Sequence, residues 1–90
     1  MINAPVLLSK DLTATYTPIC AARCVATIII ETPSTNTDSL FIQATDGSDS
    51  DDIEIPVSQW YEFESVDLAQ IYVKGTSGDI VRVIGNRVQQ

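Results

Sequence analysis

The chain has 90 residues, a formal net charge of −7 and no histidine. This length accommodates one hydrophobic core, so we expect a single domain over residues 1–90. The acidic balance disfavours nucleic acid and anionic membrane as partners, because both attract lysine and arginine. The most apolar window, VATIII (25–30), is too short to span a bilayer, and the first ten residues lack the pattern of a secretory signal. We therefore expect a soluble protein made in a cytoplasm.

The composition favours β-strands throughout. Ile, Val and Thr together account for 28 residues, against five Leu, and β-branched side chains pack well on a pleated surface. No window repeats apolar residues at helical spacing for more than one turn. The strands expected from the sequence, in chain order, cover residues 4–9, 12–17, 23–31, 39–45, 53–57, 59–65, 69–75 and 79–85.

Turn residues separate these strands. Residues 1–10 are expected to form either an N-terminal arm or an edge strand, and Pro18 is expected to end the pairing of the second strand. The segments 69–75 and 79–85 are expected to form a hairpin, in which Gly78 supplies the positive φ of a tight turn. Seven or eight short strands with turn signals about every 8–12 residues predict an all-β fold, an antiparallel and jelly-roll-like β-sandwich, with a small barrel as the alternative.

Alternation along the strands predicts which side chains face the core. The inward positions expected in three of the strands are Cys24, Ala26, Ile28 and Ile30, then Ile71 and Val73, then Val81 and Val83. In 59–65, Tyr61 and Phe63 are expected to point inward, which sends Trp60 to the other face. An exposed tryptophan is enriched at protein interfaces and in sugar-binding platforms. The alternative is that a loop or the N-terminal arm covers Trp60.

Cys20 and Cys24 are the only cysteines. On an extended segment their Cα atoms would lie about 13 Å apart, too far for a disulfide unless CAARC forms a tight turn. Zinc would need four ligands, and the chain has no histidine to complete such a site. We expect two small, buried, reduced thiols and no metal site.

The segment DGSDSDDIE (46–54) holds five of the twelve acidic side chains. The calcium loop of EF-hand proteins requires acidic ligands at positions 1, 3 and 5, glycine at 6 and glutamate at 12. Registers that start at Asp46 or at Asp49 both fail this requirement. An irregular calcium site built from Asp46, Asp49 and Asp51 stays open as an alternative. Otherwise the segment is a solvated turn kept open by charge repulsion.

Catalytic groups are scarce. The chain has no histidine to act as a base near neutral pH, and GTSGD (75–79) lacks the lysine and the following helix of a phosphate-binding loop. Glu62 and Glu64 are expected about 7 Å apart on one strand face, a separation that glycosidase carboxylates also use. Paired acids on a solvated strand face are far commoner than catalytic pairs. We expect no enzymatic activity and no cofactor.

The charges are segregated along the sequence. No basic residue lies between Arg23 and Lys74, whereas ten of the twelve acidic residues do. If the two ends of the chain lie together in the fold, the molecule is electrically two-sided. Such a distribution suits head-to-tail or docked packing, although a solvated acidic face is the commoner explanation.

Three stretches resemble small structural proteins of tailed-bacteriophage virions. They are PICAARCVATIII (18–30), STNTDSLFIQATDG (34–47) and LAQIYVKGTSGDIVRVIG (68–85), and the resemblance extends over most of the chain. The last stretch is similar to a closing hairpin of the form L-x-x-I-Y-V-x-G-x-x-G-D-x-V-x-V. One departure is IPVSQWYEF (55–63), where such proteins often have a Gly-rich turn.

The resemblance implies a capsid decoration (cement) protein, or a related head or tail accessory subunit, on the capsid surface of a virion. It also implies a homo-oligomer, with a trimer favoured over a dimer, seated on the major capsid protein. The task of such a protein is mechanical, because many weak contacts bridge neighbouring capsid subunits. We expect the interface to use Ile2, Val6 and Leu7 of the N-terminal segment together with Trp60.

Two other functions compete with this interpretation. A carbohydrate-binding module or adhesion accessory would use Trp60 and the acidic loop at 46–52, with the loop holding calcium. An inhibitor or adaptor would dock on a basic partner through its acidic face, and its binding would weaken with salt.

Overall fold

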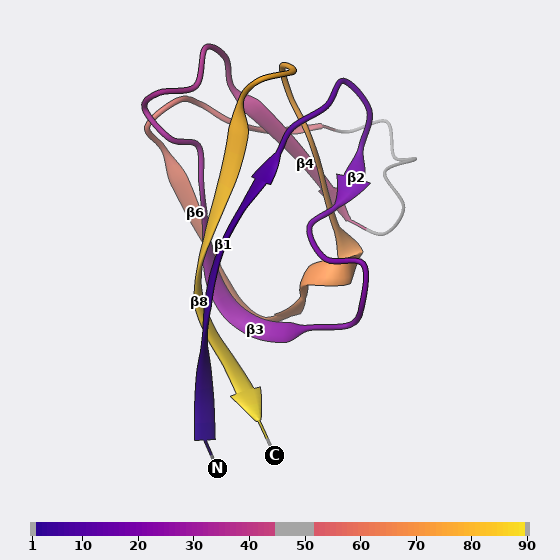
Figure 1. Ribbon diagram of the computed structural model, residues 1–90, viewed down its shortest axis with the longest axis vertical. Coiled ribbons are helices and arrows are strands. Elements are labelled where there is room, and N and C mark those ends of the chain that lie inside the picture. The colour runs from indigo at the N-terminus through magenta and orange to yellow at the C-terminus, as the bar shows by residue number, and fades with distance from the viewer. Residues whose placement is uncertain (1, 45–51, 90) are drawn as a thin grey trace.

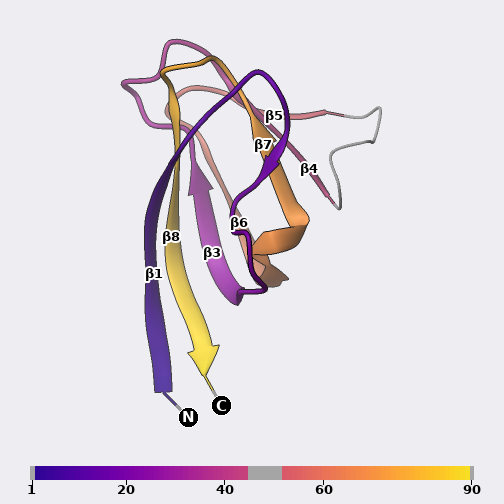
Figure 2. The same ribbon diagram turned by 45° about the vertical axis from the view of Figure 1, so that its right-hand side comes forward.

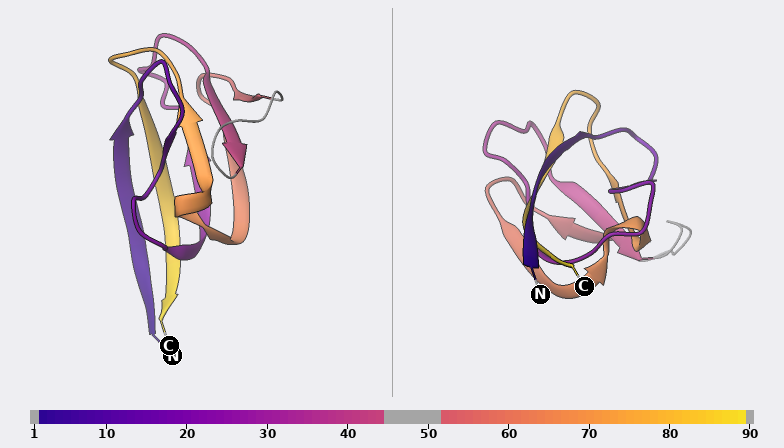
Figure 3. Two further views of the ribbon diagram at one scale, coloured as in Figure 1. Left: turned by 90° about the vertical axis from the view of Figure 1, so that its right-hand side faces the viewer. Right: turned by 60° about the horizontal axis from the view of Figure 1, so that its bottom comes forward.

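A computed structural model describes residues 2–44 and 52–89 as a sandwich of two four-stranded antiparallel sheets (Figure 1). Sheet A has the strand order β1-β8-β3-β6, and sheet B has the order β2-β7-β4-β5. Figure 2 and Figure 3 show the two sheets facing each other. The elements span Ile2–Asp11 (β1), Thr17–Pro18 (β2), Val25–Glu31 (β3), Leu40–Ala44 (β4), Ile53–Ile55 (β5), Trp60–Asp67 (β6), the 3₁₀ turn Leu68–Gln70 (η1), Ile71–Lys74 (β7) and Ile80–Gln89 (β8).

Strand pairing is nested from the ends of the chain inward. β1 pairs with β8, β2 with β7, β3 with β6 and β4 with β5, while β8 also pairs with β3 and β7 with β4. This is the strand order of an eight-stranded jelly roll. The expected jelly-roll-like sandwich is confirmed, and residues 2–11 form an edge strand of sheet A.

The core lies between the sheets and consists of alternate residues of their strands. In β3 the alternation is regular, with Ala26, Ile28 and Ile30 buried as expected and the residues between them half-buried. The other buried apolar side chains are Val6, Leu12, Ile19, Leu40, Ile42, Ile55, Leu68, Ile71, Val73, Val81 and Val83. The inward positions predicted for β7 and β8 are therefore confirmed.

Two predictions about connectivity are wrong. β7 and β8 do not form a hairpin, because β7 belongs to sheet B and β8 to sheet A. Residues 75–79 instead carry the chain from one sheet to the other, and Gly78 has the expected positive φ of 99°. The segment 12–17 is not a strand, since only Thr17–Pro18 pairs, with β7. Pro18 is tolerated there because β2 is an edge strand.

Polar side chains tie the loops together at the end of the sandwich that lies at the top of Figure 1. Asn36 donates from Nδ2 to the carbonyl of Ile80 (2.7 Å) and accepts from the Ile80 N–H at Oδ1 (3.0 Å). The buried carboxylate of Asp79 accepts from the Thr37 N–H (3.0 Å) and from the Thr37 hydroxyl. The loop between β3 and β4 is thereby fixed to the start of β8.

Gly85 allows β8 to pass close to β3. A Cβ atom at this position would lie 2.1 Å from the carbonyl oxygen of Thr27 and 2.7 Å from the Cα atom of Ile28. These are backbone atoms, so a side chain would fit only if the two strands moved apart. The pairing in the middle of sheet A therefore requires glycine.

We expect Gly85→Ala to lower the free energy of unfolding by about 1–3 kcal/mol, the usual cost of overpacking. Asn86→Ala, at the exposed position that follows, is the matched control and should leave stability nearly unchanged. Denaturant unfolding followed by circular dichroism measures both. Equal unfolding free energies for the two variants would show that β8 can move away from β3 without loss.

Candidate functional site

The outer face of sheet A carries an exposed row of aliphatic side chains. The strand register aligns Leu7 of β1, Ile84 of β8 and Ile29 of β3, and it places Glu62 of β6 at the end of the row. Leu7 is 74% exposed and Ile84 is 43% exposed, while Ile29 is half-buried. We call these three aliphatic side chains the apolar row. Exposed apolar side chains that lie next to one another mark surfaces that contact a partner.

Two exposed aromatic side chains begin β6, the edge strand on the far side of sheet A. Trp60 is 55% exposed and lies on the outer face, in register with Glu31 of β3. The alternation predicted from the sequence thus places Trp60 correctly. Tyr61 lies on the inner side, in register with Ile30, but it is 42% exposed because no other strand of the described residues lies beyond β6.

The four residues expected at an interface differ in their availability. Leu7 and Trp60 are exposed, at opposite edges of sheet A. Val6 is only 8% exposed and belongs to the core. Neighbours in a strand point to opposite faces, so Leu7 faces solvent while Val6 faces the core. The burial of Val6 does not fit the expected exposed contact, and the use of Leu7 and Trp60 at an interface stays a prediction. Ile2 pairs through its backbone with Gln89, and its side chain lies outside the part of the chain that the structure describes.

Basic and acidic residues separate across sheet A. The two ends of the chain lie side by side because β1 pairs with β8 along its whole length (Figure 1). These two strands carry three basic residues and one acidic residue, whereas β6 at the other edge carries three acidic residues and no basic one. The residues concerned are Lys10, Arg82, Arg87 and Asp11 on β1 and β8, and Glu62, Glu64 and Asp67 on β6.

Sheet B presents a cluster of polar side chains on its outer face. The Tyr16 hydroxyl donates to Oδ1 of Asp52, and Nε2 of Gln43 donates to the same oxygen (2.7 Å). Nζ of Lys74 lies 3.6 Å from Oδ2 of Asp52 and 4.8 Å from the centroid of the Tyr16 ring. The Tyr16 hydrogen bond lowers the pKa of Asp52, while burial and Asp52 raise the pKa of Tyr16. Sequence reasoning missed this cluster, because its members come from separate segments that only the strand register brings together.

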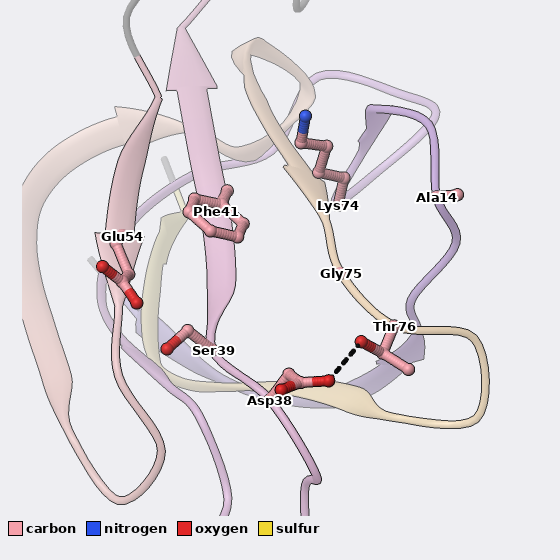
Figure 4. A pocket seen from close by; sticks show the side chains of 8 residues that line it. All are labelled: Ala14, Asp38, Ser39, Phe41, Glu54, Lys74, Gly75 and Thr76. Carbon is pink, nitrogen blue, oxygen red and sulfur yellow. Dashed lines mark hydrogen bonds between the residues drawn. The ribbon is translucent and has the colours of Figure 1, made fainter.

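A cleft of about 400 Å³ lies beside this cluster (Figure 4). The ring of Phe41 on β4 lies between Glu54 of β5 and Lys74 of β7, with which it is in register. At one end of the cleft, the hydroxyl of Thr76 donates to Oδ2 of Asp38 (2.9 Å). The side chains around an aromatic ring thus offer carboxylate, amine and hydroxyl groups, which is the make-up of many sites for small polar ligands.

The predictions on metal and thiol chemistry have different outcomes. Asp46, Asp49 and Asp51 lie outside the described residues, so an irregular calcium site there stays a prediction. Within residues 2–44 and 52–89, no three His, Cys, Asp or Glu side chains gather closely enough to hold a metal ion. Cys20 and Cys24 are free thiols, half-buried against the core. Burial, with Cys24 close by, raises the pKa of the Cys20 thiol.

Two carboxylates stabilise the loops as ionised groups. Asp67 accepts from the N–H groups of Cys24 (3.0 Å) and Ala69 (3.0 Å), and these bonds hold the pKa of Asp67 below its usual range. Asp79 has a lowered pKa for the same reason, chiefly through the Thr37 N–H. Both side chains are therefore structural anchors whose ionised form the fold prefers.

We expect the protein to lose stability as the pH falls through about 4, the ordinary pKa of aspartate. The pKa of Asp67 and Asp79 is lower in the folded state, so the unfolded chain binds more protons as the pH falls, and the free energy of unfolding decreases. Asp79→Asn should be less stable than wild type near neutral pH, and the difference should shrink below pH about 4, where Asp79 of the unfolded wild type is protonated.

Urea unfolding at a series of pH values measures this dependence. Asn86→Ala, which removes no ionisable group at an exposed position of β8, is the control and should differ from wild type by a constant amount at every pH. A difference between wild type and Asp79→Asn that stays constant across the acid range would contradict the assignment of Asp79 as an ionised anchor.

Comparison with known proteins adds no relative. No protein-family model, no curated protein and no solved structure matches the chain. Among the described residues, no helix has the length and apolar character needed to cross a membrane.

Proposed function

We propose that the chain is a non-enzymatic structural protein of a bacteriophage virion. In this proposal it is a decoration (cement) protein on the capsid surface that bridges subunits of the major capsid protein. The observation that carries the proposal is the jelly-roll strand order in a chain of 90 residues, because jelly rolls recur in viral capsid proteins. The resemblance of 18–30, 34–47 and 68–85 to small virion proteins points the same way. A fold hosts many functions, so the surface must also suit the task.

The outer face of sheet A supports a contact with a large protein surface. It is four strands wide, and the apolar row crosses three of those strands. Arg82 and Glu31 lie beside the row and pair with each other (3.2 Å). An apolar centre with charged groups at its margin is the usual anatomy of a protein interface. The face is thus suited to lie against capsid subunits.

The polar groups inside the protein support a structural rather than a catalytic role. In the described part of the chain, the buried side chains of Thr32, Asn36 and Asp79 all hold loops through hydrogen bonds. The pKa of Asp52 is lowered, as are those of Asp67 and Asp79. A glycosidase would require one carboxyl whose pKa is raised, so that it can donate a proton.

Such a protein would stabilise a capsid by repetition. One copy binds weakly, but each copy favours the assembled shell over its separated subunits by mass action. If one copy contacts two neighbouring capsid subunits, the second contact forms within an existing complex. The overall affinity for the capsid then exceeds that of either contact alone. A homo-oligomer, with a trimer favoured, multiplies this effect further.

We expect purified virions to contain this protein in a large, fixed copy number, and the recombinant protein to bind capsids that lack it. Ile29→Glu, at the β3 end of the apolar row, should weaken capsid binding tenfold or more, which corresponds to about 1.4 kcal/mol. Ile53→Glu is the matched control, because Ile53 is 50% exposed but lies on sheet B.

Co-sedimentation with capsids measures both variants, and circular dichroism shows whether they are folded. Absence of the protein from purified particles, together with no binding to capsids, would remove this proposal.

The sheet B cleft favours carbohydrate binding as a second candidate function. The ring of Phe41, between Glu54 and Lys74, could stack on a sugar while the polar groups around it hold the hydroxyls. The arrangement differs from the one expected from the sequence. Trp60 lies on sheet A, whereas the strands that flank the acidic loop, β4 and β5, belong to sheet B.

A glycan array separates the two arrangements. Binding through the cleft should be lost in Phe41→Ala and kept in Trp60→Ala, which lies on the other sheet. The reverse result would place the sugar on Trp60, and a wild-type protein that binds no glycan would eliminate this second candidate.

A further inference from the structure

We infer that copies of this chain associate head to tail through the two edges of sheet A, with Trp60 of one copy seated in a cleft between β1 and β8 of the next. This inference rests on the proposed function in one respect: in a virion, the contact would join the subunits of the oligomer. The contact itself can be measured with the pure protein, apart from any capsid.

The four edge strands of the sandwich are unequal. The edges of sheet B are short: β2 has two residues and includes Pro18, and β5 has three residues and is followed by Pro56. Short strands and proline are the devices that prevent a sheet from adding further strands. The edges of sheet A are longer, with ten residues in β1 and eight in β6. Pro5 lies in the first half of β1, and the pairing of β6 with β3 is irregular between Ala26 and Ile28. The regular stretches at these edges are therefore residues 6–11 of β1 and 60–63 of β6, which still offer a longer contact than either edge of sheet B.

The β1 edge of sheet A contains a depression. A cleft of about 290 Å³ opens there, lined by Leu7, Leu8 and Ser9 of β1 and by Arg82, Val83 and Ile84 of β8. The aliphatic side chains that it offers are those of Leu7 and Ile84, the exposed members of the apolar row, because Leu8 and Val83 point toward the core. The volume of this cleft lies at the lower limit for small-molecule sites. A cleft of this size fits one large side chain better than a separate ligand.

The opposite edge of sheet A contains the matching projection. Trp60, flanked by Tyr61, is the exposed aromatic side chain at the start of β6. The register places Ser9, Arg82, Glu31 and Trp60 in one row across the sheet. Trp60 therefore lies at the same level along the strands as Ser9 and Arg82, which line one end of the cleft. A neighbouring copy related by rotation about an axis parallel to the strands would meet the cleft with its Trp60 at the right height.

The strand directions agree with this arrangement. β1 is antiparallel to β8, β8 to β3, and β3 to β6, so β1 and β6 run in opposite directions. The same rotation keeps these directions, so the β1 edge of one copy meets the β6 edge of the next in antiparallel orientation. Antiparallel edges are the more stable way to join two strands.

The charges are complementary across the same contact. Arg82 on β8 shares the outer face of sheet A with Trp60 and Glu62, whereas Lys10 and Arg87 are in register with the buried residues Val81 and Ala26. Bringing a β6 edge against a β1 edge would place Arg82 near Glu62 and near the indole of Trp60, and the latter is a favourable cation–π pair. Two β6 edges would instead bring carboxylates together and repel each other.

A second copy of the chain is therefore the occupant that these features select. The cleft and the projecting tryptophan lie on the same sheet of one chain, as do the basic and the acidic edge. Each copy therefore offers both halves of the contact. Such a contact is heterologous, and repetition closes a ring when the rotation divides a full turn. A trimer is one of these rings.

Light scattering after size exclusion tests the contact on the pure protein. At about 100 µM, enough to populate complexes with micromolar Kd, wild type should have a mass well above the 9.8 kDa of one chain. Trp60→Ala and Leu7→Glu should each fall to the mass of one chain, and Glu62→Lys should weaken association. Ile53→Glu, exposed on sheet B, should keep the wild-type mass. Circular dichroism shows that each variant is folded.

Mixing the two monomeric variants tests the head-to-tail geometry. Trp60→Ala keeps an intact cleft and Leu7→Glu keeps an intact tryptophan, so an equimolar mixture should form a complex of two chains and stop there. Three results would each overturn the inference. The mixture could stay at the mass of one chain, Trp60→Ala alone could still associate, or wild type could be monomeric at this concentration. None of these masses depends on capsid binding, so failure of the proposed function would be seen separately, in the co-sedimentation with capsids.

Discussion

Sheet A depends on β8, because both β1 and β3 pair with this one strand. The pairing joins the first residues of the chain to the last, so the sheet forms only after the full length of chain has come together. Closing so long a loop costs conformational entropy that is recovered only when the apolar faces pack. The same pairing requires glycine at position 85 and aligns Leu7 with Ile84 on the outer face. The proposed contact surfaces are thus a consequence of how the fold closes.

The two sheets present different surfaces. Sheet A has long edges and an apolar row on its outer face, whereas sheet B has short edges and a network of polar side chains around Asp52. Protein contacts are therefore expected on sheet A, and small polar ligands on sheet B. The loops at one end are fixed by side chains such as Thr32 and Asp79, which hold both sheets in place whichever surface is used.

The sequence predicts the fold class well, because alternation and turn residues are local signals. The buried residues of β3 and the positive φ of Gly78 follow from them directly. A turn signal shows that the chain reverses, but it does not show whether the next strand joins the same sheet. The predicted hairpin of 69–75 and 79–85 is wrong for this reason. Alternation also separates Val6 from Leu7, since the two side chains point to opposite faces and the inner face is the core. The cluster around Tyr16 and Asp52 depends on register between distant segments, which no local pattern contains.

The position of Trp60 has a consequence for how this protein can be observed. It is the only tryptophan and more than half of its surface is in contact with water in the folded chain. Its fluorescence therefore comes from a hydrated indole both before and after unfolding, and it is a poor indicator of folding. A partner that covers the indole removes that water and moves the emission to shorter wavelength. The intrinsic fluorescence of the unlabelled protein thus reports association selectively.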